Sequence, residues 1–215
     1  SIAEHSDEDT FNPLYVYGPS GCGKSHLINA IGVRFKETHL QEKVVYTTAR
    51  QFQVQFTDSV RQNTTKDFIN CYQLVDMLIV DDIQEWMKAP KTLEAFFQVF
   101  NNLLRNGKQI VLACDRPPVE LQGMEERLLQ RFACGLAVEL EKPDMQLYID
   151  ILNVKCHQSG MKIPSEVIEF IANTVSSVYD LEGVMNSLKV YSTVNNSNID
   201  MDIAKRVIMR YVKLD

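Results

Sequence analysis

Short apolar runs alternate with helical patterns over the first two thirds of the chain. The runs lie at residues 14–17, 44–47, 77–80 and 109–113, and apolar residues between them recur at helical spacing, most clearly over 93–104. Strands that are apolar throughout and alternate with helices are typical of a parallel sheet covered on both faces. The pattern therefore predicts an α/β domain with three layers, α/β/α.

The stretch between Thr47 and Val75 contains more helical pattern than a return to the sheet requires. Apolar spacing predicts one helix around Phe52 and a second around Phe68. A single helix is enough to connect two parallel strands. We therefore predict a helical insertion at about 49–73.

The strand-like runs stop near residue 141, and the patterns that follow are helical. Four helices are predicted, and Pro164 and Asp200 are well placed to open two of them. This pattern indicates two domains: an α/β domain over 1–141 and a small all-helical domain over 142–215.

The segment between the first predicted strand and the first predicted helix matches G-x-x-x-x-G-K-[ST], with the residues Gly18, Pro19, Ser20, Gly21, Cys22, Gly23, Lys24 and Ser25. Such a loop turns its backbone N–H groups toward phosphate, and the following helix points its positive end at the same anion. Lys24 is expected to reach the β- and γ-phosphates and Ser25 to bind Mg²⁺. His26, the next residue, is expected to shield the phosphates.

Acidic residues follow two of the other predicted strands. In a P-loop protein, Asp81 is expected to hold the Mg²⁺ shell and Asp82 to orient the attacking water. Asp115 stands after the strand at 109–113, where a polar side chain can sense the γ-phosphate. Turn chemistry before Pro117 is an equally good explanation of Asp115.

Arg127 and Arg131 lie four residues apart and share one face of a predicted helix. One interpretation is a solvated pair that serves Glu125 or Glu126, and spacing alone favours it. The other is an arginine finger directed at the nucleotide of a neighbouring subunit, because arginine stabilises the charge on a phosphoryl group in transfer.

The composition of the chain limits the classes of protein to which it can belong but identifies no site. The net charge of −6 gives no sign of the clustered Lys and Arg that duplex binding requires, although a local basic patch stays open. No apolar run is long enough to span a membrane, and the start SIAEHSDEDT, which is expected to be a frayed end, lacks the features of a signal peptide. The cysteines form no C-x-x-C pair, so we expect free thiols in a reducing cytoplasm.

Several segments together resemble the AAA+ module of the DnaA family of bacterial replication initiators. They read NPLYVYGPSGCGKSHL, LIVDDIQ, FNNLLRNGKQIVLACDRPP, ELQGMEERLLQRF and DLEGVMNSL, in this order. The resemblance implies a P-loop NTPase of the AAA+ type with a helical lid. It also implies binding of ATP or ADP with Mg²⁺, slow hydrolysis used as a switch, head-to-tail assembly at the origin and opening of the duplex.

The resemblance assigns roles to individual residues. It implies that Arg131 is the arginine finger, Arg127 a second interface arginine and Asp115 the first sensor. It also implies that the insertion lies against single-stranded DNA. The residues expected on that face are Thr57, Arg61, Lys88 and Lys91, with Lys66 nearby. Trp86 is expected to pack within its own domain, with base stacking as the alternative.

The chain departs from the family pattern at three places. Tyr179 stands where the family's second sensor is an arginine, and a tyrosine at the nucleotide can stack or hydrogen-bond but supplies no fixed positive charge. Thr57 and Asp58 stand where the family tends to have an apolar residue and a lysine at its strand-binding face. The segments that in the family wrap the adenine and read duplex DNA are expected to lie outside these residues.

Two functions follow from these observations. The first is an initiator module that binds origin DNA and works with a replicative helicase or its loader. The second is a DnaA-like regulatory adaptor or helicase loader that binds nucleotide but switches poorly. A small-molecule P-loop kinase is disfavoured because no basic lid over the phosphates is evident.

Overall fold

The computed structural model describes residues 11–121, 124, 126–195 and 198–212. The expectations for SIAEHSDEDT and for Glu125 lie outside these residues. The chain divides into two compact units: Ser1–Pro19 with Lys24–Leu140, and Ser20–Gly23 with Glu141–Asp215. The four residues Ser20–Gly23 therefore belong with the second unit, whereas the sequence pattern assigned them to the first.

The first unit is built on a parallel sheet of five strands, in the order β2-β3-β4-β1-β5. The strands are β1 (Leu14–Tyr17), β2 (Val44–Thr48), β3 (Met77–Asp81), β4 (Gln109–Cys114) and β5 (Leu136–Glu139). The predicted α/β class is confirmed, and the four predicted strands are present. The sequence did not predict β5, because this edge strand alternates half-buried with exposed residues and lacks a continuous apolar run.

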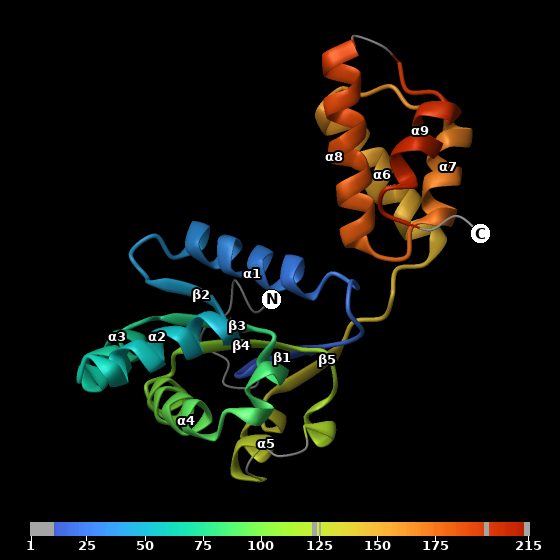
Figure 1. The fold of residues 1–215 in the computed structure, drawn as a ribbon. Helices are drawn as coiled ribbons and strands as arrows, with labels where there is room; N and C mark the ends of the chain where they lie inside the picture. Colours follow the sequence, from blue (N-terminus) through green and yellow to red (C-terminus); the bar gives the residue numbers. More distant parts are fainter. Residues whose placement is uncertain (1–10, 122–123, 125, 196–197, 213–215) are drawn as a thin grey trace. The chain divides into compact units, whose positions relative to one another are not determined.

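Both faces of the sheet are covered by helices, as Figure 1 shows. Helix α1 (Lys24–Thr38) packs on one face, where Ile28 and Phe35 meet Leu14 and Ile79. The opposite face is covered by α2 (Ala49–Arg61), α3 (Thr65–Gln73), α4 (Pro90–Arg105) and α5 (Glu126–Ala133). Successive strand residues point to opposite faces, so the apolar runs supply both cores.

Helices α2 and α3 form the extra crossover that the sequence predicted. Thr48 caps α2 through a capping box with Gln51. Thr64 stands at the N-cap position of α3, but its side chain makes no capping hydrogen bond. The two helices pack together through Phe52, which contacts the ring of Phe68 at a centroid distance of 5.0 Å.

Trp86 belongs to this aromatic core. It lies in the 3-10 helix η2 (Ile83–Lys88), is 0% exposed, and donates its indole N–H to the carbonyl of Ala49 at 2.7 Å. Its ring centroid lies 5.2 Å from that of Phe52 and 4.7 Å from that of Phe96. The expectation that Trp86 packs within its own domain is therefore correct, and the base-stacking alternative is wrong because the ring is buried.

Gly135 lies directly before β5, where this strand meets β1. The Leu136 N–H donates to the Pro13 carbonyl at 3.0 Å, next to the first pairing of β5 with β1. A Cβ atom on Gly135 would lie 1.9 Å from that carbonyl oxygen. The close approach of these two backbone segments therefore requires glycine. A second 3-10 helix, η3 (Pro118–Glu120), precedes α5.

The second unit is helical over its described residues. It contains α6 (Met145–Ser159), α7 (Ser165–Thr174), α8 (Val178–Asn195) and α9 (Met201–Ile208) around a core of its own. Asp144 and Asp200 cap α6 and α9 by accepting backbone N–H bonds at 2.8 Å each. Within the described residues of both units, no helix is long and apolar enough to cross a membrane. All five cysteines are free thiols.

Candidate nucleotide-binding site

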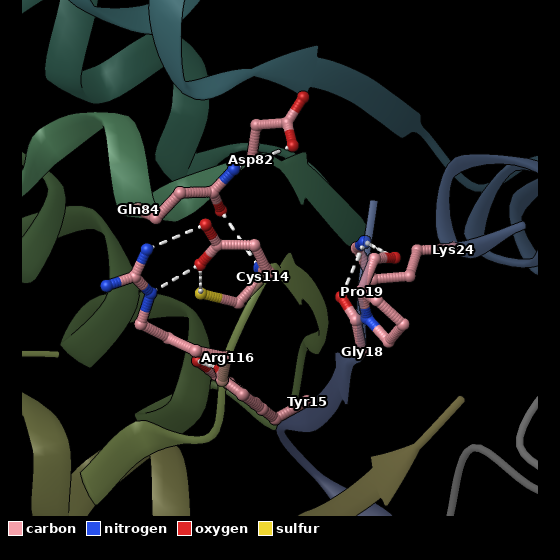
Figure 2. A network of polar contacts seen from close by, with 9 residues as sticks. Tyr15, Gly18, Pro19, Lys24, Asp82, Gln84, Cys114 and Arg116 are labelled. Carbon is pink, nitrogen blue, oxygen red and sulfur yellow. Dashed lines mark hydrogen bonds and ion pairs between the residues drawn. The ribbon is translucent and has the colours of Figure 1, made fainter. Parts of the chain in front are cut away.

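The phosphate-binding pattern lies between the end of β1 and the start of α1. The Lys24 ammonium is buried and donates to the carbonyls of Gly18 and Pro19 at 2.9 and 3.0 Å, as Figure 2 shows. Gly23 has a φ of +102°, which a residue with a side chain rarely adopts. Glycine therefore permits the conformation of the loop. The Lys24 side chain is held against the carbonyls of Gly18 and Pro19, and from there it can turn toward a phosphate.

Helix α1 supplies the second element of an anion site. Its 15 residues begin at Lys24, so its first N–H groups and the positive end of its dipole face the loop. Ser25 and His26, in its first turn, have exposed side chains. These side chains are accessible to a nucleotide and its metal ion.

Two acids stand at the end of β3. Asp81 is 2% exposed, and its carboxylate accepts from the Asp82 N–H at 2.9 Å and from the Tyr46 hydroxyl at 2.8 Å. Burial and the bond to this carboxylate raise the pKa of Tyr46. Asp82 takes the left-handed conformation, with φ 58° and ψ 42°. A residue with a side chain is held there at some cost, and such positions cluster at functional sites.

The oxygen donors suit Mg²⁺. The Ser25 hydroxyl and the Asp81 carboxylate are hard ligands, and Mg²⁺ is usually bound by one or two protein oxygens together with phosphate oxygens and water. Among the described residues there is no group of three or more His, Cys, Asp or Glu side chains that could hold a metal by itself. A Mg²⁺ ion held by Ser25 and Asp81 would take its remaining ligands from phosphate oxygens and water.

Asp115 follows β4, which lies between β3 and β1 in the sheet. Its two carboxylate oxygens accept from the Arg116 Nε at 2.6 Å and from the Arg116 Nη2 at 2.8 Å. Arg116 first, and the charge of Lys24 to a smaller extent, hold the pKa of Asp115 below its ordinary value. The carboxyl ends of three adjacent strands thus bring together the P-loop lysine, the acid pair and an ionised Asp115.

Sequence reasoning missed two residues of this network. Arg116 binds Asp115 at both oxygens, and Gln84 accepts from the Asp115 N–H at 3.2 Å while donating to the Asp82 carboxylate at 2.9 Å. The adjacency of Asp115 and Arg116 was a usable signal. Gln84 is the last residue of the segment LIVDDIQ that carries the family resemblance, but nothing in the sequence indicated its partners, because the sequence does not show which strand ends are neighbours.

The remaining predicted residues are on the surface of their units. Arg131 in α5 is exposed, and the Arg127 guanidinium lies 5.9 Å from the centroid of the Phe97 ring. Tyr179, in the first turn of α8 in the second unit, is 79% exposed.

The residues expected to meet single-stranded DNA are also exposed. They are Thr57, Arg61, Lys66, Lys88 and Lys91, on α2, α3, η2 and α4. The Thr57 hydroxyl donates to the Gln53 carbonyl at 2.8 Å, and Arg61 lies 3.5 Å from Asp58. The nearby carboxylate of Asp58 reduces the positive charge of this face.

Comparison with protein families gives a match over much of the first unit. Residues 1–139 match the family model described as the bacterial DnaA ATPase domain. The chain is 52% identical over 216 residues to the chromosomal replication initiator protein DnaA of Bacteroides fragilis, covering 100% of this chain and 45% of the relative. The corresponding protein of Flavobacterium psychrophilum is 40% identical over 214 residues, covering 99% of this chain and 45% of the relative. The chain thus spans less than half the length of these relatives.

Solved structures give the same result. Domain III of the replication initiation protein DnaA from Thermotoga maritima superposes with a TM-score of 0.91 at 30% identity, over 99% of this chain and 90% of that one. A replication initiator DnaA bound to AMPPCP and single-stranded DNA gives a TM-score of 0.79 at 32% identity, over 87% of this chain and 59% of that one.

Proposed function

This chain belongs to the DnaA family of bacterial replication initiators, and we propose that it is the ATP-binding AAA+ module of such an initiator. The observation that carries the proposal is the convergence of Lys24, the Asp81–Asp82 pair and Asp115 at the carboxyl ends of three adjacent strands. Ligands bind at this edge in open α/β sheets. The adaptor alternative is not favoured, since the relatives from Bacteroides fragilis and Flavobacterium psychrophilum are chromosomal replication initiator proteins.

The proposed site divides its tasks among the described residues. The loop amides and Lys24 bind the phosphates, and Ser25 with Asp81 holds Mg²⁺, which neutralises phosphate charge when bound. Asp82 orients the attacking water. Asp115 senses the γ-phosphate, and its fixed partner Arg116 keeps it ionised and oriented.

Assembly and DNA binding complete the proposal. Arg131 is exposed on α5 and serves as the finger for the nucleotide of a neighbouring copy, with Arg127 at the same interface. Hydrolysis by one copy alone is then slow, which suits a switch. The insertion α2–α3 meets single-stranded origin DNA, in the cytoplasm of a bacterium and in concert with a helicase or its loader.

Calorimetric titration of the chain with ATP and Mg²⁺ tests the nucleotide site. Lys24→Ala removes the buried ammonium, and we expect affinity to fall by at least about 100-fold, as for loss of a charge-assisted contact to phosphate. Lys36→Ala, at the opposite end of the same helix, is the matched control and should bind as the unaltered chain does. Undiminished binding by Lys24→Ala would refute the site.

A further inference from the structure

The side-chain amide of Gln84 joins two acids that come from different strands. Its Nε2 donates to the Asp82 carboxylate at 2.9 Å, and its Oε1 accepts from the Asp115 N–H at 3.2 Å. Figure 2 shows Gln84 between Asp82 and the turn that leads to Arg116. Asp82 follows β3 and Asp115 follows β4, so this single amide spans the carboxyl ends of two neighbouring strands.

The Gln84 amide restrains two groups, Asp82 and Asp115, that take part in the proposed site. Asp82 is in the left-handed conformation, where its backbone alone has little preference to stay. Asp115 is fixed on its other side by the two bonds from Arg116. The backbone of Arg116 is itself tied to the β1 strand, because its carbonyl accepts from the Tyr15 hydroxyl at 2.9 Å. The chain of bonds therefore runs from Asp82 through Gln84, Asp115 and Arg116 to the strand that precedes the phosphate loop.

The chemistry of glutamine suits this position. An amide has a donor end and an acceptor end, so it can meet a carboxylate and a backbone N–H at once without adding charge. A glutamate in its place would keep the acceptor for Asp115 but would set a second negative charge against Asp82. A methionine would keep the length of the side chain and lose both bonds.

We propose that Gln84 is a positioning residue for hydrolysis, which fixes the Asp82 carboxylate relative to Asp115. This inference rests on the proposed ATPase function and adds to it a residue that acts through others. Small displacements of a catalytic group are costly because hydrolysis depends on alignment of water with the phosphoryl group. Nucleotide affinity depends instead on the phosphate loop and Lys24. Within the described residues, the side-chain hydrogen bonds of Gln84 go to Asp82 and Asp115.

The test compares Gln84→Met and Gln84→Glu with the unaltered chain, at protein concentrations that permit assembly. Turnover of ATP should fall by about 10- to 100-fold, the size expected when one hydrogen bond to a charged group is lost. Affinity for ADP should stay within about threefold. Gln84→Glu should be slower than Gln84→Met, because it replaces a donor to Asp82 by a like charge. Urea unfolding shows whether each variant is folded.

A matched control uses the same chemistry elsewhere in the chain. Gln146 donates from its Nε2 to the Asp150 carboxylate at 3.0 Å on the exposed surface of α6. Gln146→Glu removes a glutamine-to-aspartate bond of nearly the same length, and its turnover should equal that of the unaltered chain.

The possible outcomes separate the inference from the function beneath it. If the unaltered chain does not turn over ATP, the hydrolytic part of the proposed function fails and the inference fails with it, whereas calorimetric binding of ATP tests the nucleotide site separately. If that chain is active and both Gln84 variants match it, the inference alone is overturned. A parallel loss of ADP affinity and turnover would also overturn it, because Gln84 would then support the whole site rather than the alignment of Asp82.

Discussion

Replacement of Trp86 by phenylalanine tests how the crossover helices are attached to the end of β3. Trp86 lies just after the Asp81–Asp82 pair, and its indole N–H donates to Ala49 at the start of α2. Phenylalanine keeps an aromatic ring but removes this donor and the second ring of the indole. The change therefore weakens the contact between α2 and the segment that follows the acid pair.

The expected cost can be worked from the contacts. Loss of the hydrogen bond at 2.7 Å costs about 1 kcal/mol. The missing part of the ring corresponds to roughly two methylene groups, each worth about 0.8 kcal/mol when buried. Because the site is 0% exposed and packed between Phe52 and Phe96, it cannot collapse without moving other rings. We expect the free energy of unfolding to fall by about 2–3 kcal/mol.

Urea unfolding followed by circular dichroism measures this difference, and iodide quenching of the tryptophan in the unaltered chain measures its accessibility. The emission of Trp86 should be protected from iodide until the first unit unfolds. Tyr211→Phe, which removes a half-exposed hydroxyl bonded to Ser187 at 2.7 Å, is the control and should cost under about 1 kcal/mol. A loss below about 0.5 kcal/mol for Trp86→Phe, or quenching by iodide in the folded chain, would refute the packing of Trp86 between Phe52 and Phe96.

Three other predictions concern assembly, sensing and stability. Arg131→Ala should bind ATP within about threefold of the unaltered chain but fail to assemble with ATP, because the arginine acts on a neighbour's phosphate; light scattering that still rises would contradict this role. Tyr179→Arg should raise the rate of hydrolysis if the second-sensor position lacks a positive charge, and an unchanged rate would count against that account. The Lys108 ammonium lies 2.6 Å from the Asp76 carboxylate and lowers the pKa of that carboxyl in the folded chain. The ion pair therefore stabilises the fold at pH values above the ordinary pKa of aspartate. This stabilisation is lost as the pH falls through the lower pKa of the folded state. Asp76→Asn should therefore cost about 1 kcal/mol near pH 6 and less near pH 3, by urea unfolding at both values.

The sequence predicted most of the first unit because its buried strands are continuous apolar runs. Runs such as 77–80 are apolar on both faces, and the P-loop pattern between β1 and α1 has a direct structural meaning. The edge strand β5 gave no such signal, since half of its residues are exposed. A tryptophan beside two acids gave two interpretations, and burial among the rings of α2 and α4 decided between them.

The candidate site was predictable as a set of motifs but not as a network. Each motif marks one strand end, and the parallel topology implies that such ends meet at one edge. The strand order β3-β4-β1 makes Asp115 the neighbour of both the acid pair and the phosphate loop. No single motif predicts this order. The bridge through Gln84 depends on this order and on the left-handed backbone of Asp82, so no local pattern could have revealed it.

The close approach at Gly135 has a consequence for how substitutions in this chain are interpreted. No side chain can be added there without forcing β5, and with it the end of α5, away from β1, because the obstacle is the backbone of Pro13. Position 135 belongs to none of the motifs that identify the site. In a complete mutational scan it should nevertheless be as intolerant as Lys24. Intolerance to substitution in this protein is therefore not by itself a map of the residues that perform its chemistry.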